Sequence, residues 1–150
     1  MRTTQEYEGL RLRVYRCTAG HRTIGYGHNL DAGNNDNVVK IGLDPELLKV
    51  GQAITVAQAE QLFFLDYSDA ALAVRRLVPE LDDLHTIARR VLIDLCFNMG
   101  YVTLSKFKNT LAAFRRADYA AAADGLEKSL WYKQVKTRGR EIVAALREIA

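Results

Sequence analysis

Residues 7–28 read YEGLRLRVYRCTAGHRTIGYGH and decide how the chain is interpreted. Apolar and polar side chains alternate over residues 10–16, which is typical of a half-buried strand. Residues 18–20 contain turn formers, and residues 22–26 include β-branched side chains that favour a returning strand. The stretch therefore predicts an antiparallel hairpin, entered from a short helix over residues 5–9.

The segment after the hairpin has few regular patterns. Residues 31–37 read DAGNNDN, a composition dense in turn formers that predicts an exposed loop. Asp44 and Pro45 are suited to the start of a helix, because proline is tolerated at the first helical position.

From Thr55 onward the sequence predicts helices. Thr55 and Gln58 have the spacing of a capping box, in which each side chain bonds a backbone amide of the other residue. Apolar residues then recur at helical spacing over about residues 56–77, and Pro79 ends the pattern.

The remaining third of the chain reads as shorter helices. Gly100 is suited to end one of them, and Asp118 is suited to begin another. The expected helices cover residues 84–98, 106–115, 119–129 and 138–149. The whole pattern predicts an α+β fold with a small N-terminal lobe over about residues 10–54, a long connecting helix, and a helical lobe over about residues 80–150.

The composition excludes several classes of protein. A formal net charge of +3 over 150 residues is too mild to indicate nucleic-acid binding by itself. No apolar run is long enough to cross a bilayer, and the first residues lack the apolar segment of a secretory signal. The two cysteines stand in different segments, so we expect free thiols. Three scattered histidines, without CxxC or HExxH spacings, predict no metal site.

Three side chains of the opening stretch could meet in one site. Eight residues separate Glu8 from Cys17, and five separate Cys17 from Thr23. A hairpin that follows a turn of helix can direct a carboxylate, a thiol and a hydroxyl into one cleft. Cleavage of a glycosidic bond needs a carboxylic acid on one side and a group that handles water on the other. Glu8 suits the first role, and Cys17 with Thr23 suits the second.

These residues resemble the catalytic region of the phage-type lysozymes, the endolysins of glycoside hydrolase family 24. The family's pattern is a glutamate, eight residues, an aspartate or cysteine, five residues and a threonine, here beside the TIGYGH of residues 23–28. The resemblance continues through residues 97–100 (FNMG), residues 107–110 (FKNT), and the pair Trp131-Tyr132 followed by Arg138. It spans nearly the whole chain and implies a single lysozyme-like domain of α+β fold.

The resemblance implies hydrolysis of the β-1,4 bond between N-acetylmuramic acid and N-acetylglucosamine in bacterial peptidoglycan. Glu8 would be the general acid, which must hold a proton near neutral pH. The best-known members carry aspartate where this chain has Cys17, and a thiol, with a reference pKa of about 8.5, is a poor copy of a carboxylate. Cys17 would either position or deprotonate a water, giving inversion, or attack the sugar carbon, giving retention. The resemblance favours inversion, and a role for Cys17 as a small buried apolar residue stays open.

Other residues have supporting roles in the same resemblance. Thr23 would help to hold the attacking water, although a β-branched side chain is also an ordinary strand residue. His28 would pair with Asp66 on the long helix, which would raise the histidine pKa, and Arg138 would reach Glu8. A surface histidine and a solvated arginine are the alternatives. The residues expected to bind sugar are Phe97, which could equally belong to the core, Asn98 and Thr110, while Trp131 and Tyr132 are expected to pack beneath the last helices.

The implied partner is the peptidoglycan glycan strand, bound by a monomer without cofactor, nucleic acid or stable membrane insertion. Such an endolysin would accumulate in the host cytoplasm and reach the wall at lysis, although a trimmed anchor or a domain cut from a longer tail protein would have the same sequence. Two other functions stay open. A lytic transglycosylase would leave anhydro ends, and a non-catalytic wall- or polyanion-binding module would use the surface arginines.

Overall fold

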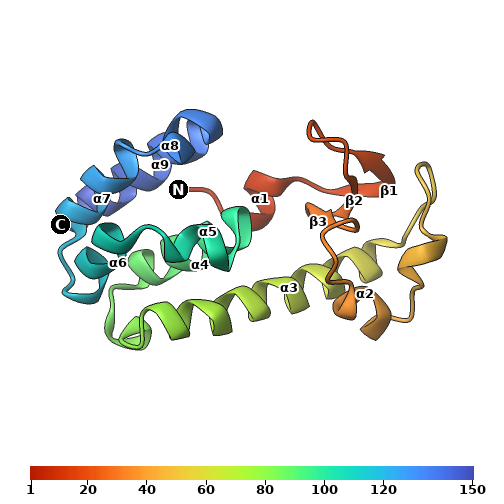
Figure 1. Cartoon of the computed structure of the whole chain (residues 1–150), viewed down its shortest axis with the longest axis horizontal. Coiled ribbons are helices and arrows are strands. Elements are labelled where there is room, and N and C mark those ends of the chain that lie inside the picture. Colours follow the sequence, from red (N-terminus) through yellow and green to blue (C-terminus); the bar gives the residue numbers. More distant parts are fainter. The chain divides into compact units, whose positions relative to one another are not determined.

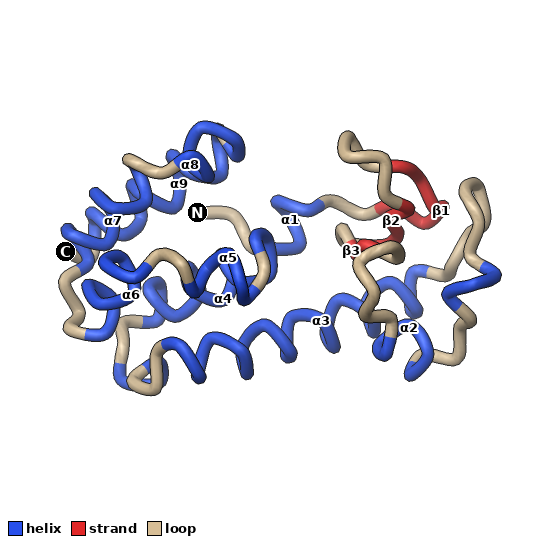
Figure 2. The backbone as a smooth tube through the Cα atoms, viewed as in Figure 1, coloured by secondary structure: helices blue, strands red, loops and turns tan.

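The computed structural model describes residues 1–150 and contains nine α-helices and three short strands (Figures 1 and 2). The chain divides into two units. The strand-bearing unit is Thr4–Ser68, and the helical unit is Asp69–Ala150 together with Met1–Thr3. All three strands belong to the first unit, so the predicted α+β class is confirmed.

The predicted hairpin forms the sheet of the strand-bearing unit. β1 (Arg11–Arg16) pairs antiparallel with β2 (Arg22–Gly25). β2 also pairs with β3 (His28–Asn29), a strand of two residues that was too short to be predicted. Tyr15 lies opposite Thr23 in the ladder, which places the end of β1 beside the start of β2.

A short helix replaces part of the loop predicted over residues 31–37, so that prediction is wrong at its end. α2 (Asp36–Lys40) begins inside the segment. Asn37 is only 6% exposed, and its side-chain amide donates to Asp66 Oδ1 over 2.8 Å. This hydrogen bond satisfies a polar group that burial would otherwise make unfavourable. Residues of a turn-forming type are thus held in a helix by a contact distant in sequence.

The predicted helix starts have the expected caps. The 3₁₀ helix η1 (Pro45–Leu47) begins after Asp44, whose carboxylate accepts the backbone amide two residues on over 2.9 Å. Before α3 (Val56–Leu77), Gln58 N donates to Thr55 Oγ1 over 3.1 Å and Thr55 N donates to Gln58 Oε1 over 2.9 Å. The capping box is confirmed, and α3 has the predicted bounds.

One apolar cluster holds the strand-bearing unit together. It combines side chains from the sheet, from the segment after it and from the first turns of α3: Val14, Ile24, Leu30, Val38, Leu48, Ile54, Ala59 and Leu62. Because β1 and β2 contribute to this core directly, the hairpin is fixed against α3 rather than lying free on the surface.

The helical unit contains six helices beyond α3 and the 3₁₀ helix η2 (Leu81–Asp83). Gly100, at a φ of +84°, ends the first of them, and Asp118 caps α7 by accepting Ala121 N over 3.1 Å, as predicted. Two of the six, α5 and α8, were not predicted, because they are too short to show a helical period. The helices are α4 (Thr86–Met99), α5 (Tyr101–Ser105), α6 (Lys108–Arg115), α7 (Tyr119–Glu127), α8 (Leu130–Val135) and α9 (Thr137–Glu148).

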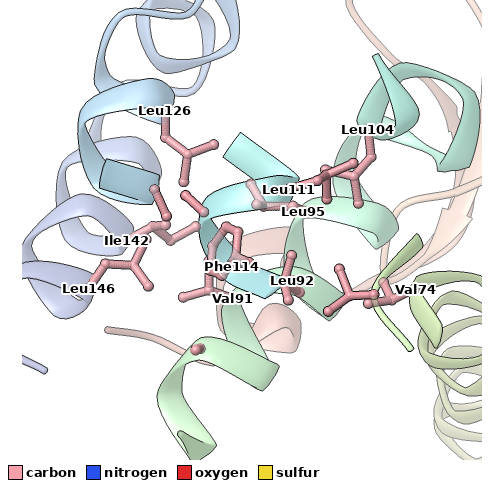
Figure 3. Close-up of a cluster of buried hydrophobic side chains, with 14 of the residues drawn as sticks. Val74, Val91, Leu92, Leu95, Leu104, Leu111, Phe114, Leu126, Ile142 and Leu146 are labelled. Atoms are coloured by element: carbon pink, nitrogen blue, oxygen red, sulfur yellow. The ribbon is translucent and has the colours of Figure 1, made fainter. Parts of the chain in front are cut away.

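A second apolar core lies inside the helical unit (Figure 3). Phe114 is fully buried, with Leu92 and Leu95 of α4 and Leu126 of α7 around it in the same cluster. Removing a buried phenylalanine side chain costs about 3–5 kcal/mol, so this cluster is a large part of the unit's stability. No helix in the chain is both long and apolar enough to span a bilayer.

Candidate active site

Glu8 is the last residue of α1 (Thr4–Glu8), a turn of helix continued by a hydrogen bond of 2.9 Å from Gly9 N to Gln5 O. Gly9 follows at a φ of +71°, which turns the chain into β1. The carboxylate of Glu8 lies against Gly27, where a Cβ would be 2.6 Å from Glu8 Oε2. Gly27 also has a φ of +78°. Both the backbone conformation and the space above it therefore require glycine at this position.

Cys17 begins the turn between β1 and β2. Its amide donates to His21 O over 2.9 Å, and Gly20 N donates to Cys17 O over 2.8 Å. The thiol is free, as predicted, and half-buried. The backbone amide of His21 lowers the pKa of the Cys17 thiol, partial burial opposes this, and the backbone amide of Ala19 lowers it further. The net pKa lies below the ordinary cysteine value, so the thiolate fraction at a given pH is larger than in a free cysteine.

Thr23 is 5% exposed and lies on β2. Its hydroxyl donates to His21 O over 3.0 Å, and the same carbonyl accepts the Cys17 amide. One backbone group therefore ties both candidate residues to the turn. A hydroxyl that donates its proton to a carbonyl keeps its lone pairs for another donor, such as a water molecule.

His28 and Asp66 lie together at the centre of a polar network in the strand-bearing unit. His28 Nδ1 is 2.7 Å from Asp66 Oδ2, and Nε2 is 3.0 Å from Asn35 Oδ1. The Asn35 amide nitrogen donates to Leu30 O over 2.8 Å, which directs its oxygen toward the histidine. Both ring nitrogens thus face acceptors, an arrangement that the doubly protonated imidazolium satisfies. Burial lowers the pKa of His28, but the hydrogen bond and charge of Asp66, with Asn35, outweigh it and raise the pKa overall.

Arg138, at the start of α9, forms a buried ion pair with Asp94 of α4. Arg138 Nε donates to Asp94 Oδ2 over 3.0 Å, and Nη2 donates to Oδ1 over 2.8 Å. The Asp94 side chain is fully buried and that of Arg138 is 9% exposed. Loss of one member of such a pair costs about 3–5 kcal/mol, because it leaves an uncompensated charge. The solvated alternative for Arg138 is therefore wrong, and its approach to Glu8 stays a prediction.

The three expected sugar-binding residues lie on two helices of the helical unit. Phe97 and Asn98 are neighbours near the end of α4, and Asn98 Oδ1 accepts Trp131 Nε1 over 2.9 Å. Trp131 is buried in the apolar core, which confirms its expected packing. Phe97 is half-buried and packs against the same core. Thr110 of α6 is buried, and its hydroxyl lies where a Cβ at Gly125 of α7 would be. A sugar contact for these residues stays a prediction.

The family model described as "Phage lysozyme" matches residues 5–148. The chain belongs to the phage lysozyme family. This lysozyme is 30% identical to an endolysin of Acyrthosiphon pisum secondary endosymbiont phage 1, over 91% of the chain and 78% of the endolysin. It is 29% identical to the probable T4-type lysozyme 2 of Dictyostelium discoideum, over 91% of the chain and 86% of that relative. It is also 29% identical to the pre-baseplate central spike protein Gp5 of Enterobacteria phage T4, over 90% of the chain, but spans only 25% of that protein. The predicted enzyme class, a glycoside hydrolase of the lysozyme type, is confirmed.

Several polar residues of this lysozyme escaped sequence reasoning. Asn35 and Asn37 were predicted to lie in an exposed loop, although both amides join the network of His28 and Asp66. Asp94 was missed because its partner lies 44 residues away. A signal was present, since a lone carboxylate amid the apolar side of a helix needs a buried cation. No group of three or more histidine, cysteine, aspartate or glutamate side chains is placed to hold a metal ion.

Proposed function

We propose that this lysozyme is a muramidase that hydrolyses the β-1,4 bond between N-acetylmuramic acid and N-acetylglucosamine in bacterial peptidoglycan. Glu8 is the general acid, and Cys17 with Thr23 handles the attacking water. The observation that carries the proposal is the contact between the Glu8 carboxylate and Gly27. Both residues belong to the same unit as the hairpin that carries the thiol of Cys17 and the hydroxyl of Thr23. The family match, whose range of residues 5–148 covers the positions of all three residues, supports it.

Glu8 donates its proton to the glycosidic oxygen as the bond to the anomeric carbon breaks. The sugar then gains oxocarbenium character, and protonation prevents the departing oxygen from leaving as an alkoxide. The acid must be held within hydrogen-bonding distance of that oxygen for the transfer to be efficient. The contact between the Glu8 carboxylate and the Gly27 backbone supports a fixed position, because the backbone limits movement of the carboxylate in that direction.

Cys17 and Thr23 act on the water. The Thr23 hydroxyl, which donates to His21 O, accepts a hydrogen bond from the water and orients its oxygen toward the sugar. The Cys17 thiolate accepts the proton that the water loses as its oxygen bonds to the anomeric carbon. The lowered pKa of the thiol supports this role, because it increases the thiolate fraction near neutral pH. Attack on the face opposite Glu8 inverts the configuration.

The same groups allow a covalent route. If the sulfur itself attacked the anomeric carbon, a thioglycoside would form and water would then displace it with net retention. The half-buried position of Cys17 and the hydroxyl beside it favour water activation, because a nucleophile needs direct access to the sugar. The configuration of the first product, observed by NMR, separates the two routes.

The helical unit contributes the proposed sugar contacts. Phe97 and Asn98 are adjacent on α4, one turn after Asp94, so the buried pair of Asp94 and Arg138 supports the helical turn that carries them. Thr110 contributes from α6. We further propose that both units form one lysozyme domain that acts as a monomer on a glycan strand, and that it remains in the host cytoplasm until lysis. The endolysin among the relatives supports this last point.

The proposal is tested by the loss of turbidity of bacterial cells stripped of their outer membrane, with wild type and Glu8→Gln side by side. Lysis by the wild type alone, with reducing N-acetylmuramic acid ends among the products, is the expected result. Anhydro ends would identify a lytic transglycosylase instead. Lysis by neither folded protein, across several wall types, would contradict the proposal and favour a binding module.

A further inference from the structure

Glu60 of α3 joins the two elements that hold the Glu8 carboxylate. Gln5 Nε2 donates to Glu60 Oε2 over 2.9 Å, and the Tyr26 hydroxyl donates to Glu60 Oε1 over 2.6 Å. Gln5 belongs to the same turn of helix as Glu8, and Tyr26 immediately precedes the Gly27 on which that carboxylate rests. We propose that Glu60 is a positioning residue that sets the place of Glu8 in catalysis. The inference rests on the proposed role of Glu8 as general acid.

The bond between Tyr26 and Glu60 is the shorter of the two contacts. Its length is that of a charge-assisted hydrogen bond between a hydroxyl and a carboxylate, which is about twice as strong as a neutral one. The hydrogen bond to Glu60 raises the pKa of Tyr26, so the phenol keeps its proton and remains a donor. The ring is also fixed from a second side, since it meets Phe63 edge-on with centroids 5.3 Å apart.

A positioning role follows from the size of α1. Five residues are too few for a helix to be stable by itself, because nucleation is unfavourable. The direction of Glu8 therefore depends on contacts that α1 makes elsewhere, and Gln5 with Glu60 is one of them. Hydrogen bonds between exposed side chains add little to global stability, so this contact contributes through geometry more than through unfolding free energy.

The test compares Tyr26→Phe and Glu60→Gln with the control Glu46→Gln, the same chemical change at an exposed glutamate of η1. Tyr26→Phe keeps the ring against Phe63 and removes only the hydroxyl. With soluble peptidoglycan fragments as substrate, we expect both variants to lower kcat about tenfold and to leave KM nearly unchanged, since the acid is misplaced while sugar contacts remain. The control should match the wild type in both constants.

A second comparison places each change in a Glu8→Gln background. If Glu60 acts through Glu8, its substitution should produce no further loss once the acid is gone. Wild-type kcat in both single variants, or an undiminished loss in the Glu8→Gln background, would overturn the inference. Neither result would contradict the proposed function. That proposal is contradicted by a different result, a Glu8→Gln variant as active as the wild type. Thermal unfolding of each variant distinguishes misplacement of the acid from a general loss of fold.

Discussion

The carboxylate of Glu8 occupies the space that a side chain at Gly27 would need. The proposed acid is therefore held against the backbone of the TIGYG turn, and the glycine there serves the site as well as the turn. This contact links a residue at the end of α1 to the bend between β2 and β3.

Gly27→Ala should displace the acid. The new Cβ would meet Glu8 Oε2 at 2.6 Å and Glu8 Cδ at 3.3 Å, so the carboxylate must move. We expect kcat to fall about a hundredfold, because an ångström-scale misplacement of a reacting group costs that much. Gly33→Ala is the matched control, since Gly33 has a φ of +86° and nothing within 4 Å of its added Cβ. It should lose about 1–2 kcal/mol of stability to backbone strain and keep its activity. Equal kcat in the two variants would contradict this account of Glu8.

Substitutions of Cys17 should change the pH profile of kcat/KM. The wild-type rate should rise with pH through the thiol pKa, which lies below the ordinary cysteine value, because the thiolate is the proposed base. Cys17→Asp should retain activity and shift this rise toward the reference carboxyl pKa of about 3.9. Cys17→Ala should lose most activity at every pH. Full activity in Cys17→Ala would exclude the sulfur from the mechanism.

The pair of His28 and Asp66 should stabilise the fold in a pH-dependent way. The pKa of His28 is raised in the folded state. The stabilisation that His28 adds to the fold is therefore fully present below its unfolded-state pKa of about 6.5, and it is lost as the pH rises through its folded-state pKa. His28→Asn should therefore cost about 2 kcal/mol near pH 5.5, the worth of a hydrogen bond to a charged group, and less at alkaline pH. Urea unfolding across this range measures the difference.

The control for this measurement is Thr86→Ser at the start of α4. Thr86 is exposed, and its hydroxyl accepts a hydrogen bond from Arg89 that serine can also accept. Because the substitution adds and removes no titratable group, the stability of this variant relative to the wild type should change little with pH. A wild-type advantage over His28→Asn that does not shrink at high pH would show that His28 acts by packing rather than by charge.

Lys136→Gly should stabilise the protein. Lys136 joins α8 to α9 at a φ of +52° and a ψ of −109°, a conformation that suits glycine and strains other residues. Relief of that strain should raise the free energy of unfolding by about 1 kcal/mol and leave activity unchanged. Lys133→Gly, inside α8, should lower it by about 1 kcal/mol. Thermal unfolding of both variants shows whether each substitution raises or lowers the stability. A lower unfolding midpoint for Lys136→Gly than for the wild type would contradict the prediction.

Local chemistry accounts for what could be predicted from the sequence. The capping box of Thr55 and Gln58 predicted the start of α3, and the helical period that stops before Pro79 predicted its end. The alternation before Cys17 and the turn formers after it placed the hairpin. Such signals lie within a few residues of the structure they specify, so one sequence is enough to read them.

The contacts that were missed join residues distant in the chain. Asn37 and Asp66 are 29 residues apart, Tyr26 and Glu60 are 34 apart, and Arg138 and Asp94 are 44 apart. Each pair joins two elements that are distant in the chain and lie together only in the folded structure, and the sequence near either residue gives no sign of its partner. The same holds for the candidate site. The spacing of Glu8, Cys17 and Thr23 is visible in the sequence, whereas the contacts that orient Glu8, from Gly27 and through Glu60, are not.

The most direct test of the central claim is digestion of purified peptidoglycan in water enriched in ¹⁸O, with the released fragments analysed by mass spectrometry. If Glu8 is the acid of a hydrolysis, wild type should release fragments whose N-acetylmuramic acid reducing ends carry one ¹⁸O, and folded Glu8→Gln should release almost none. Unlabelled anhydro ends, or equal release by Glu8→Gln, would contradict the account.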